Sequence, residues 1–491
     1  MKSTFLRLFI AALALSLTVP TAGFAQTPPA SQIIMPTPQP MPTQGGTPLP
    51  YPAYGTPAPD VAQLKEKKGV PTSVSLQQAT KIGVALSPVF ESQNAQWAAI
   101  HAKYTAEKQA LYPGVSGNAT IGKSYQNGSL SLSTAFPSAT PGSGFAANST
   151  TASETASITI QQLIYDGGRT IAAIHSAKSA DYAGRGTLIR NLESLGLNVA
   201  NAYYAVLQDN ATVVADAQLV KEFEVNEQSV VAQIRNGAAA RSDLAGAQFQ
   251  TAQARGNLVT AQGQAIAAQA TFATTLGLDA DAEVVPKPLQ AETQSPNPSY
   301  APSLNRALLL RPDYIAAQYT VESDKEGLRY AKLARFPILT AGVTDEVSRN
   351  FALFTNNFLN SKTIGLNLAI PIYDQGQTNY NVAVAAATLD QAVAALNQTK
   401  LQVESDVRSA LANLISARAL LVQTDAELTA AKVSLDATQA QYKVGATTII
   451  NVVTAEANLS TAQSDQIHAL YGVQNAQQNY LYATGVSDLQ L

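Results

Sequence analysis

Residues 372–376 have the sequence IYDQG, and the closely similar IYDGG stands at residues 164–168, which is 208 positions earlier (372 − 164). Two further pairs of segments share this offset: residues 236–238 (NGA) with 444–446 (VGA), and residues 276–277 (LG) with 484–485 (TG). An offset that stays constant over about a hundred residues indicates an internal duplication.

Each copy of IYDxG is followed by a long segment with a helical pattern. No proline or glycine interrupts residues 379–444, and apolar side chains recur every seven residues from Val407 to Leu435. A helix of this length would be roughly 100 Å long at 1.5 Å rise per residue. A period of seven sustained this long imposes supercoiling, as in an ordinary two-stranded coiled coil or in a larger assembly of helices.

Gly237 and Gly445 interrupt the two long helical segments at equivalent positions. The pattern predicts that the chain turns at each glycine and returns as a second helix, to about Thr275 in the first half and Ala483 in the second. The expected elements are therefore two helical hairpins, which are too long for a compact domain.

Segments with alternating apolar and polar residues precede each long helix. Ile364, Leu366 and Leu368, for example, alternate with smaller or polar residues. This period of two is typical of β-strands with one apolar face. The four expected strands cover about residues 114–125, 156–164, 338–347 and 363–370, with outward-facing loops between the members of each pair.

The expected strand pairs have the character of a membrane β-barrel, in which strands alternate apolar and polar faces. Four strands are too few to close a barrel, because about eight is the practical minimum. Three copies of the chain would supply 12 strands and enclose a water-filled lumen. Aromatic residues stand at the four junctions between helices and strands, as expected for an interfacial belt at one rim: Tyr112, Tyr165, Phe336 and Tyr373.

The N-terminal region has the features of an exported protein. Residues 1–25 combine basic residues, a short apolar run and a small-residue cleavage site, so they are expected to be a signal peptide. Residues 26–70 are expected to be a disordered linker, since residues 26–60 contain 11 of the 25 prolines. The chain has no cysteine, so neither disulfides nor a lipoprotein anchor is expected.

The remaining chain is expected to divide into a first repeat at 71–279, a linker at 280–302 and a second repeat at 303–491. The formal net charge of −3 argues against a nucleic-acid partner, which would attract basic patches. No catalytic constellation, phosphate-binding loop or metal-ligand cluster is recognisable. We therefore expect neither an enzyme nor a cofactor-binding protein.

The order of elements, repeated twice after a signal peptide, resembles the TolC-like outer membrane efflux protein family over roughly residues 72–487. The motifs that carry the resemblance are residues 371–377 (PIYDQGQ) and residues 442–453 (YKVGATTIINVV). The resemblance implies a mixed α and β membrane protein: a homotrimer with a 12-stranded β-barrel in outer-membrane lipid of a Gram-negative bacterium, continuing into a periplasmic α-helical barrel. It also implies a belt formed by the termini and the inter-repeat linker.

The resemblance further implies a function and partners. The chain would be the exit duct of a tripartite efflux pump or type I secretion system, and would dock a periplasmic adaptor protein linked to an inner-membrane pump. Docking would use the hairpin tips, which correspond here to Gly237, Gly445, Val444 and Ala446. The cargo stays open between drugs, metal ions, polysaccharide and secreted protein.

The candidate pore aperture lies beside these tips, at Asp243, Tyr442, Asn451 and Thr454. In well-known family members two acidic residues of the second repeat ring the pore, and an arginine helps to lock it. The matching positions here are Asn451, Thr454 and Thr447, which are uncharged, whereas Asp243 and Tyr442 match the family pattern. Asp243 is also in position to cap the return helix, and the sequence leaves both roles open.

Two other classes of protein have long helical hairpins. A periplasmic adaptor would have one hairpin rather than two, together with a lipoyl-like β domain. A structural spacer would have no need of alternating strands. Both stay as alternatives, and pore conductance distinguishes a channel from either.

Overall fold

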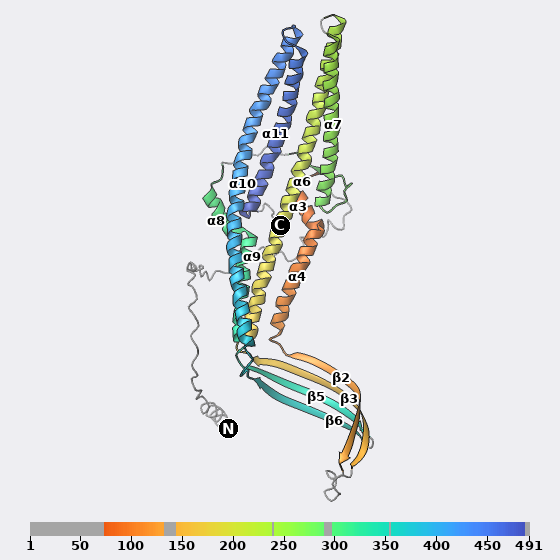
Figure 1. The fold of residues 1–491 in the computed structure, drawn as a ribbon, viewed down its shortest axis with the longest axis vertical. Helices are drawn as coiled ribbons and strands as arrows, with labels where there is room; N and C mark the ends of the chain where they lie inside the picture. Colours follow the sequence, from red (N-terminus) through yellow and green to blue (C-terminus); the bar gives the residue numbers. More distant parts are fainter. Residues whose placement is uncertain (1–72, 132–143, 238–239, 289–296, 353–354, 487–491) are drawn as a thin grey trace. The chain divides into compact units, whose positions relative to one another are not determined.

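The computed structural model describes residues 73–131, 144–237, 240–288, 297–352 and 355–486. The expected signal peptide and proline-rich linker lie outside the described residues. Each half of the chain contains a two-residue strand, a short and a medium helix, a pair of long strands and a long helical hairpin (Figure 1).

In the first half these elements are β1 (Ser73–Val74), α3 (Leu76–Leu86), α4 (Pro88–Gln109), β2 (Gly114–Ser131), β3 (Gly144–Tyr165), α6 (Arg169–Arg235) and α7 (Arg241–Thr275). In the second half they are β4 (Val285–Pro286), α8 (Tyr300–Leu310), α9 (Pro312–Leu333), β5 (Ile338–Ala352), β6 (Thr355–Ala369), α10 (Gln377–Lys443) and α11 (Ile449–Thr484). The segment expected as a plain linker, 280–302, thus contains β4 and the start of α8.

The two halves correspond with two different offsets. The long helices α6 and α10 each have 67 residues and begin 208 positions apart (377 − 169). The medium helices α4 and α9 each have 22 residues and begin 224 positions apart (312 − 88). The first half therefore has 16 more residues (224 − 208) between its medium and long helices, in the region of the β2–β3 hairpin.

The IYDxG motif starts each long helix. Asp166 accepts hydrogen bonds from the backbone N–H of Gly168 (2.9 Å) and of Thr170 (2.6 Å), which lack partners within the first turn of α6. Burial alone would raise the pKa of Asp166, but the hydrogen bonds from Thr170 and Gly168 outweigh it and lower this pKa below its ordinary value. Gly168 has a φ of 88°, which favours glycine because a β-carbon is strained there.

The second repeat uses the same device. Asp374 accepts from the backbone N–H of Gly376 (3.1 Å) and of Thr378 (2.8 Å) at the start of α10. Gly376 has a φ of 85°, close to that of its equivalent in the first repeat. The duplicated motif is therefore a helix-start signal that redirects the chain from a strand into a long helix.

The four long strands form one antiparallel sheet in the order β2-β3-β5-β6 (Figure 1). Gly114 pairs with Gln161, and Ile338 pairs with Ala369, so the helix-proximal ends of all four strands meet at one edge of the sheet. The strand lengths expected from the sequence were too short. Residues expected as loops, up to Ser131 in β2 and from Gly144 in β3, continue the ladder.

The same correction applies to the second pair of strands, where β5 extends to Ala352 and β6 begins at Thr355. The reason is that ladder hydrogen bonds join backbone groups, so pairing continues through segments whose side chains show no clear alternation. The residues between the strands of each pair, 132–143 and 353–354, lie outside the described part of the chain.

The long helices pack against one another and against the medium helices. α6 contacts α7, α9, α4 and α11, while α10 contacts α11 and α9. Gly186 of α6 allows a close approach to α9, because a β-carbon there would lie 2.8 Å from the carbonyl oxygen of Pro312. Among the helices that the structure describes, none combines the length and hydropathy needed to cross a bilayer.

An ionic network around the buried Arg311 joins α6 of the first half to α9 and α10 of the second half. Arg311, between α8 and α9, is 2% exposed and donates to Asp313 (2.6 Å) and to Asp406 of α10 (2.9 Å). Arg190 of α6 donates to Glu193 (3.0 Å) and lies 3.5 Å from Asp313. Removing Arg311 would take its ion pair from Asp406 and leave Asp313 with Arg190 alone.

The start of the first repeat is tied to the inter-repeat segment. β1 and β4 pair in parallel, and the Tyr203 hydroxyl of α6 donates to the backbone carbonyl of Lys287 at 2.7 Å. Burial raises the pKa of Tyr203. The two repeats are thus connected through a small sheet as well as through their helices.

Candidate functional site

The ends of the two helical hairpins form the candidate site. α10 ends at Lys443, and Gly445 follows with a φ of 73°. The backbone N–H of Gly445 donates to the Tyr442 carbonyl (3.0 Å), and that of Ala446 donates to the Gln441 carbonyl (2.9 Å). This pair of bonds is the Schellman arrangement, which requires a left-handed residue and so favours glycine.

Gly237 holds the equivalent place after α6, with a φ of 72°. No atom of the described residues lies within 4 Å of a β-carbon built at either glycine. A β-carbon at either glycine would therefore disturb the turn only through the backbone conformation, because the surrounding space is open. Val444 is 80% exposed beside the second turn, and Ile450 is 70% exposed on the returning helix. The second tip therefore presents apolar side chains to its surroundings.

Asp243 connects the two hairpins. Its Oδ2 accepts from the backbone N–H of Ala240 (3.3 Å), which supports the start of α7, and from the Tyr442 hydroxyl near the end of α10 (3.4 Å). Burial raises the pKa of Tyr442, and the negative charge of Asp243 raises it further. Both roles considered for Asp243 are therefore compatible with its geometry, since the cap uses one carboxylate oxygen.

Asn451 and Thr454 are exposed on α11 and bond locally, to the turn before the helix and to the helix itself. The Asn451 amide donates to the Thr447 hydroxyl (2.8 Å), and the Thr454 hydroxyl donates to the Ile450 carbonyl (2.9 Å). The structure thus brings Asp243 and Tyr442 together, whereas it shows no hydrogen bond from Asn451 or Thr454 to either of them in the described residues.

Glu456 is a functional candidate that the sequence analysis missed. It is 2% exposed, between α11 and α6, and its Oε1 accepts from the Asn226 side chain at 2.9 Å. Its Oε2 has no hydrogen-bond partner among the described residues. Burial, together with the nearby charge of Glu222, raises its pKa to about 7. The available signal was its spacing, because Val452 and Leu459 place position 456 on a buried seam.

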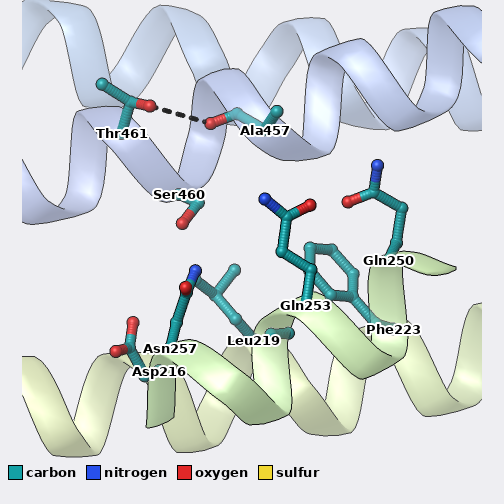
Figure 2. A pocket seen from close by; sticks show the side chains of 10 residues that line it. Asp216, Leu219, Phe223, Gln250, Gln253, Asn257, Ala457, Ser460 and Thr461 are labelled. Carbon is teal, nitrogen blue, oxygen red and sulfur yellow. Dashed lines mark hydrogen bonds between the residues drawn. The ribbon is translucent and has the colours of Figure 1, made fainter. Parts of the chain in front are cut away.

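A cavity of about 180 Å³ lies at the same joint, between α6, α7 and α11 (Figure 2). Figure 2 shows the side chains of Gln253 and Asn257 on α7 facing Ser460 on α11. Asp216 of α6 also lines this cavity, and burial raises its pKa. The joint between the hairpins thus combines an apolar seam with polar and titratable groups, a lining suited to ordered water.

The four aromatic residues expected as a belt lie at the helix-proximal edge of the sheet. Tyr165 ends β3, Tyr112 and Phe336 precede β2 and β5, and Tyr373 follows β6. All four are exposed, from 44% for Phe336 to 84% for Tyr373.

Comparison with known proteins identifies the chain. The model of a family described as outer membrane efflux protein matches residues 84–278 and 303–486. The chain belongs to the outer membrane efflux protein family. The TolC-like resemblance inferred from the sequence is thereby confirmed, and so is a place in the outer membrane.

Individual relatives of this efflux protein agree with that assignment. BepC of Brucella suis biovar 1 (strain 1330), an outer membrane efflux protein, is 25% identical over 333 residues, 67% of this chain and 72% of that protein. TolC of Escherichia coli (strain K12), an outer membrane protein, is 25% identical over 347 residues, 68% and 70% of the two chains. The structure of the Campylobacter jejuni CmeC outer membrane channel has the same fold, with a TM-score of 0.70 at 15% identity, covering 84% of this chain and 85% of CmeC.

Proposed function

We propose that the efflux protein assembles as a homotrimer and forms a continuous exit duct. Twelve strands, four from each copy, close one β-barrel in the outer membrane. The long helical hairpins of the three copies form an α-helical barrel on the periplasmic side. Substrates pass through this duct passively, since the energy for export is supplied by the partners.

The open sheet carries this proposal. β2 and β6 are its edge strands, and each has one side of its backbone unpaired within the described chain. Such edges are templates for pairing with another strand. Ile364 of β6 is 81% exposed and Ile121 of β2 is 84% exposed, as expected for side chains that face lipid. If β6 of one copy pairs with β2 of the next, the unpaired backbone groups of both edge strands form hydrogen bonds.

Cross-linking in native membranes tests the assembly, and planar-bilayer recording tests the pore. We expect a cross-linked trimer, heat-resistant migration on a gel and single-channel conductance from the purified protein. Monomers or dimers as the largest cross-linked species would contradict the proposal. A trimer without conductance would support the proposed assembly and contradict the proposed duct.

The partners proposed for this duct are a periplasmic adaptor and an inner-membrane pump, of an efflux or a type I secretion system. Two relatives are named for export, the pyoverdine export outer membrane proteins OpmQ of Pseudomonas aeruginosa and of Pseudomonas putida. The exposed apolar side chains Val444 and Ile450, together with Ala446 and the turns at Gly237 and Gly445, are the surface to which an adaptor would bind.

Gly445→Arg is expected to abolish efflux while leaving the trimer intact. The left-handed backbone costs a non-glycine residue about 1–2 kcal/mol, and the open space accommodates the new side chain. The added charge and bulk then project from the apolar docking surface. The effect is measured as the drug susceptibility of a strain in which this protein is the outer-membrane component for efflux. Gly263→Arg, in open space within α7, is the matched control, and equal susceptibility of the two variants would remove the docking role.

Asp243→Asn is expected to reduce the preference of the pore for cations. In a trimer Asp243 would occur three times near the aperture, where a ring of negative charge attracts cations. Asparagine retains an oxygen that accepts from Ala240, so the cap of α7 is preserved. Single-channel recording measures selectivity and block by divalent ions. Unchanged values would show that Asp243 serves as a cap and not as a charged ring.

A further inference from the structure

The four-stranded sheet has two chemically different faces, because successive residues of a strand point to opposite sides. One row of paired positions crosses the sheet with apolar side chains only: Val115, Ile160, Val343 and Ile364. The next row lies on the opposite face and has hydroxyl groups only: Ser116, Thr159, Thr344 and Thr363. In the proposed barrel the apolar face therefore meets lipid, and the hydroxyl face lines the lumen.

Most of the charged residues of the sheet lie on its apolar face. The four strands, within the described residues, contain six charged positions. Five of these share the face of the apolar row and form what we call the outer girdle: Lys123, Glu154, Asp345, Arg349 and Lys362. A charge that faces lipid is costly at the middle of a bilayer and costs little at its interfaces. The outer girdle is therefore expected at one boundary of the membrane.

The distance of the outer girdle from the aromatic belt fits the boundary away from the periplasm. In three of the four strands a charged residue stands 11 positions from the aromatic residue at the helix-proximal end: Lys123 from Tyr112, Glu154 from Tyr165 and Lys362 from Tyr373 (123 − 112, 165 − 154 and 373 − 362). Eleven residues extend roughly 36 Å along a strand. At a tilt of about 45° this is roughly 25 Å along the membrane normal, which is the height of the apolar band of a membrane barrel.

The two lysines of the outer girdle lie on the edge strands of the sheet, Lys123 on β2 and Lys362 on β6 (Figure 1). Ile121 is 84% exposed and Ile364 is 81% exposed. Each of these isoleucines is two positions from a lysine, so it lies on the same face and deeper in the apolar band. Each edge strand thus combines a cation with an apolar surface below it, which suits an amphiphile with an anionic headgroup.

Neither lysine is held in a short ion pair. The Lys362 Nζ is 3.4 Å from the Asp345 Oδ2, and its side chain is 71% exposed. This distance exceeds the roughly 2.7–2.9 Å of a charge-assisted hydrogen bond. Lys123 is exposed and forms no ion pair within the described chain, where Glu154 lies 4.0 Å from Arg349 instead. Exposed ion pairs of this kind contribute little to stability, so an external anion competes with them readily.

The two lysines meet only in the assembled barrel. Within one chain they stand at opposite edges of the sheet, on β2 and β6. In the proposed trimer β6 of one copy pairs with β2 of the next, and paired strands are about 4.8 Å apart. Both lysines stand at the same level above the aromatic belt, so Lys362 of one copy and Lys123 of the next lie together. Each of the three seams between copies therefore presents two cations.

We propose that each seam binds a phosphate group of a bisphosphorylated glycolipid of the outer leaflet, of the lipopolysaccharide class. The phosphate lies between Lys362 of one copy and Lys123 of the next, since the ammonium group of lysine binds phosphate as a compact charge. The acyl chains lie along Ile364 and Ile121. The outer girdle stands at the end of the sheet away from the helices, so the leaflet away from the periplasm supplies the lipid.

Charge favours this class of lipid over a zwitterionic phospholipid. The outer girdle has three cations and two carboxylates, a net charge of +1 in each chain (3 − 2). The ammonium group of phosphatidylethanolamine would bring a further positive charge to the two lysines. The inference rests on the proposed trimer, because a single chain has only half of the site.

Native mass spectrometry of the purified, delipidated trimer tests the proposal, with bisphosphorylated lipid A, phosphatidylglycerol or phosphatidylethanolamine added in detergent. We expect the unmodified trimer to retain up to three molecules of lipid A and to prefer it to both phospholipids. Lys123→Gln and Lys362→Gln should each reduce retention of lipid A about tenfold, the effect of one charged hydrogen bond. Lys432→Gln is the matched control and should change nothing, because this exposed lysine of α10 lies roughly 80 Å along the helix from its start at the sheet.

The number of bound lipids tests the shared site. If each lysine bound a lipid of its own, the unmodified trimer would retain six molecules and either variant would retain three with unchanged affinity, which would contradict a site at the seam. Equal retention of lipid A and phosphatidylglycerol by the unmodified trimer would contradict the glycolipid. Equal retention by Lys123→Gln and Lys432→Gln would also overturn the proposal. The trimer mass in each spectrum reports the assembly separately: its absence would contradict the proposed duct, whereas an intact trimer without a lipid preference would contradict the lipid site alone.

Discussion

Arg311→Met is expected to lower the free energy of unfolding of the helical part by about 3–5 kcal/mol. The substitution leaves Asp313 and Asp406 facing a partly buried space without the arginine that donates to both. Burial raises the pKa of Asp313, but its bonds and charge contacts with Arg311 and Arg190 outweigh it and lower this pKa. The variant should therefore also make Asp313 easier to protonate.

The measurement is thermal unfolding of the purified protein, followed by the helical circular dichroism signal. Lys325→Met is the matched control, because Lys325 lies on α9, the helix that follows Arg311, and is 3.1 Å from Glu322, with side chains 57% and 42% exposed. An exposed pair of this kind contributes about 0–1 kcal/mol. Similar unfolding temperatures for the two variants would show that the buried network does not stabilise the joint of α6, α9 and α10.

The unmodified protein is expected to lose stability as the pH rises from about 4.5 to about 7, and Glu456→Gln is expected to remove this loss. The pKa of Glu456 is about 7 in the folded chain, against an ordinary value of 4.5. A raised carboxyl pKa means that the folded state holds the proton more tightly. The stabilisation that comes from this bound proton is complete below pH 4.5. It declines as the pH rises and is lost above pH 7.

The size of this effect follows from the shift in pKa. The difference between the folded and the ordinary pKa of Glu456 corresponds to a change of about 3 kcal/mol in the free energy of unfolding between low and neutral pH. Glutamine keeps a neutral side chain of the same shape beside Asn226, so Glu456→Gln should be the more stable protein at pH 8 and similar at pH 4. Unfolding temperatures across this range provide the measurement. Glu427→Gln, on the exposed surface of α10, is the control, and an equal pH response in both variants would exclude Glu456 as the source.

The ionisation of Glu456 is also expected to affect the opening of the duct, since this side chain lies where the first and second helical hairpins meet. Ionised Glu456 faces Glu222 and Asn226 of α6, and no cation among the described residues pairs with it. If the hairpins separate when the aperture opens, neutral and alkaline pH should favour separation over acidic pH. Conductance recorded across the same pH range for Glu456→Gln addresses this point directly.

The sequence alone determined the features that depend on local chemistry. The two IYDxG copies, the absence of proline and glycine from 379–444 and the glycines at 237 and 445 place the beginnings and ends of the long helices, because capping, helix propensity and left-handed turns act over a few residues. The family followed from the same motifs. The offset of 224 is also visible in the sequence, in Pro88 with Pro312 and Pro113 with Pro337.

Only the tertiary structure decided which distant side chains meet. Arg311 and Asp406 are 95 positions apart, and Asn226 and Glu456 are 230 positions apart. No local pattern encodes these encounters, because they depend on the rotation and offset with which whole helices pack. The same packing determines burial, and burial is what gives Glu456 its raised pKa.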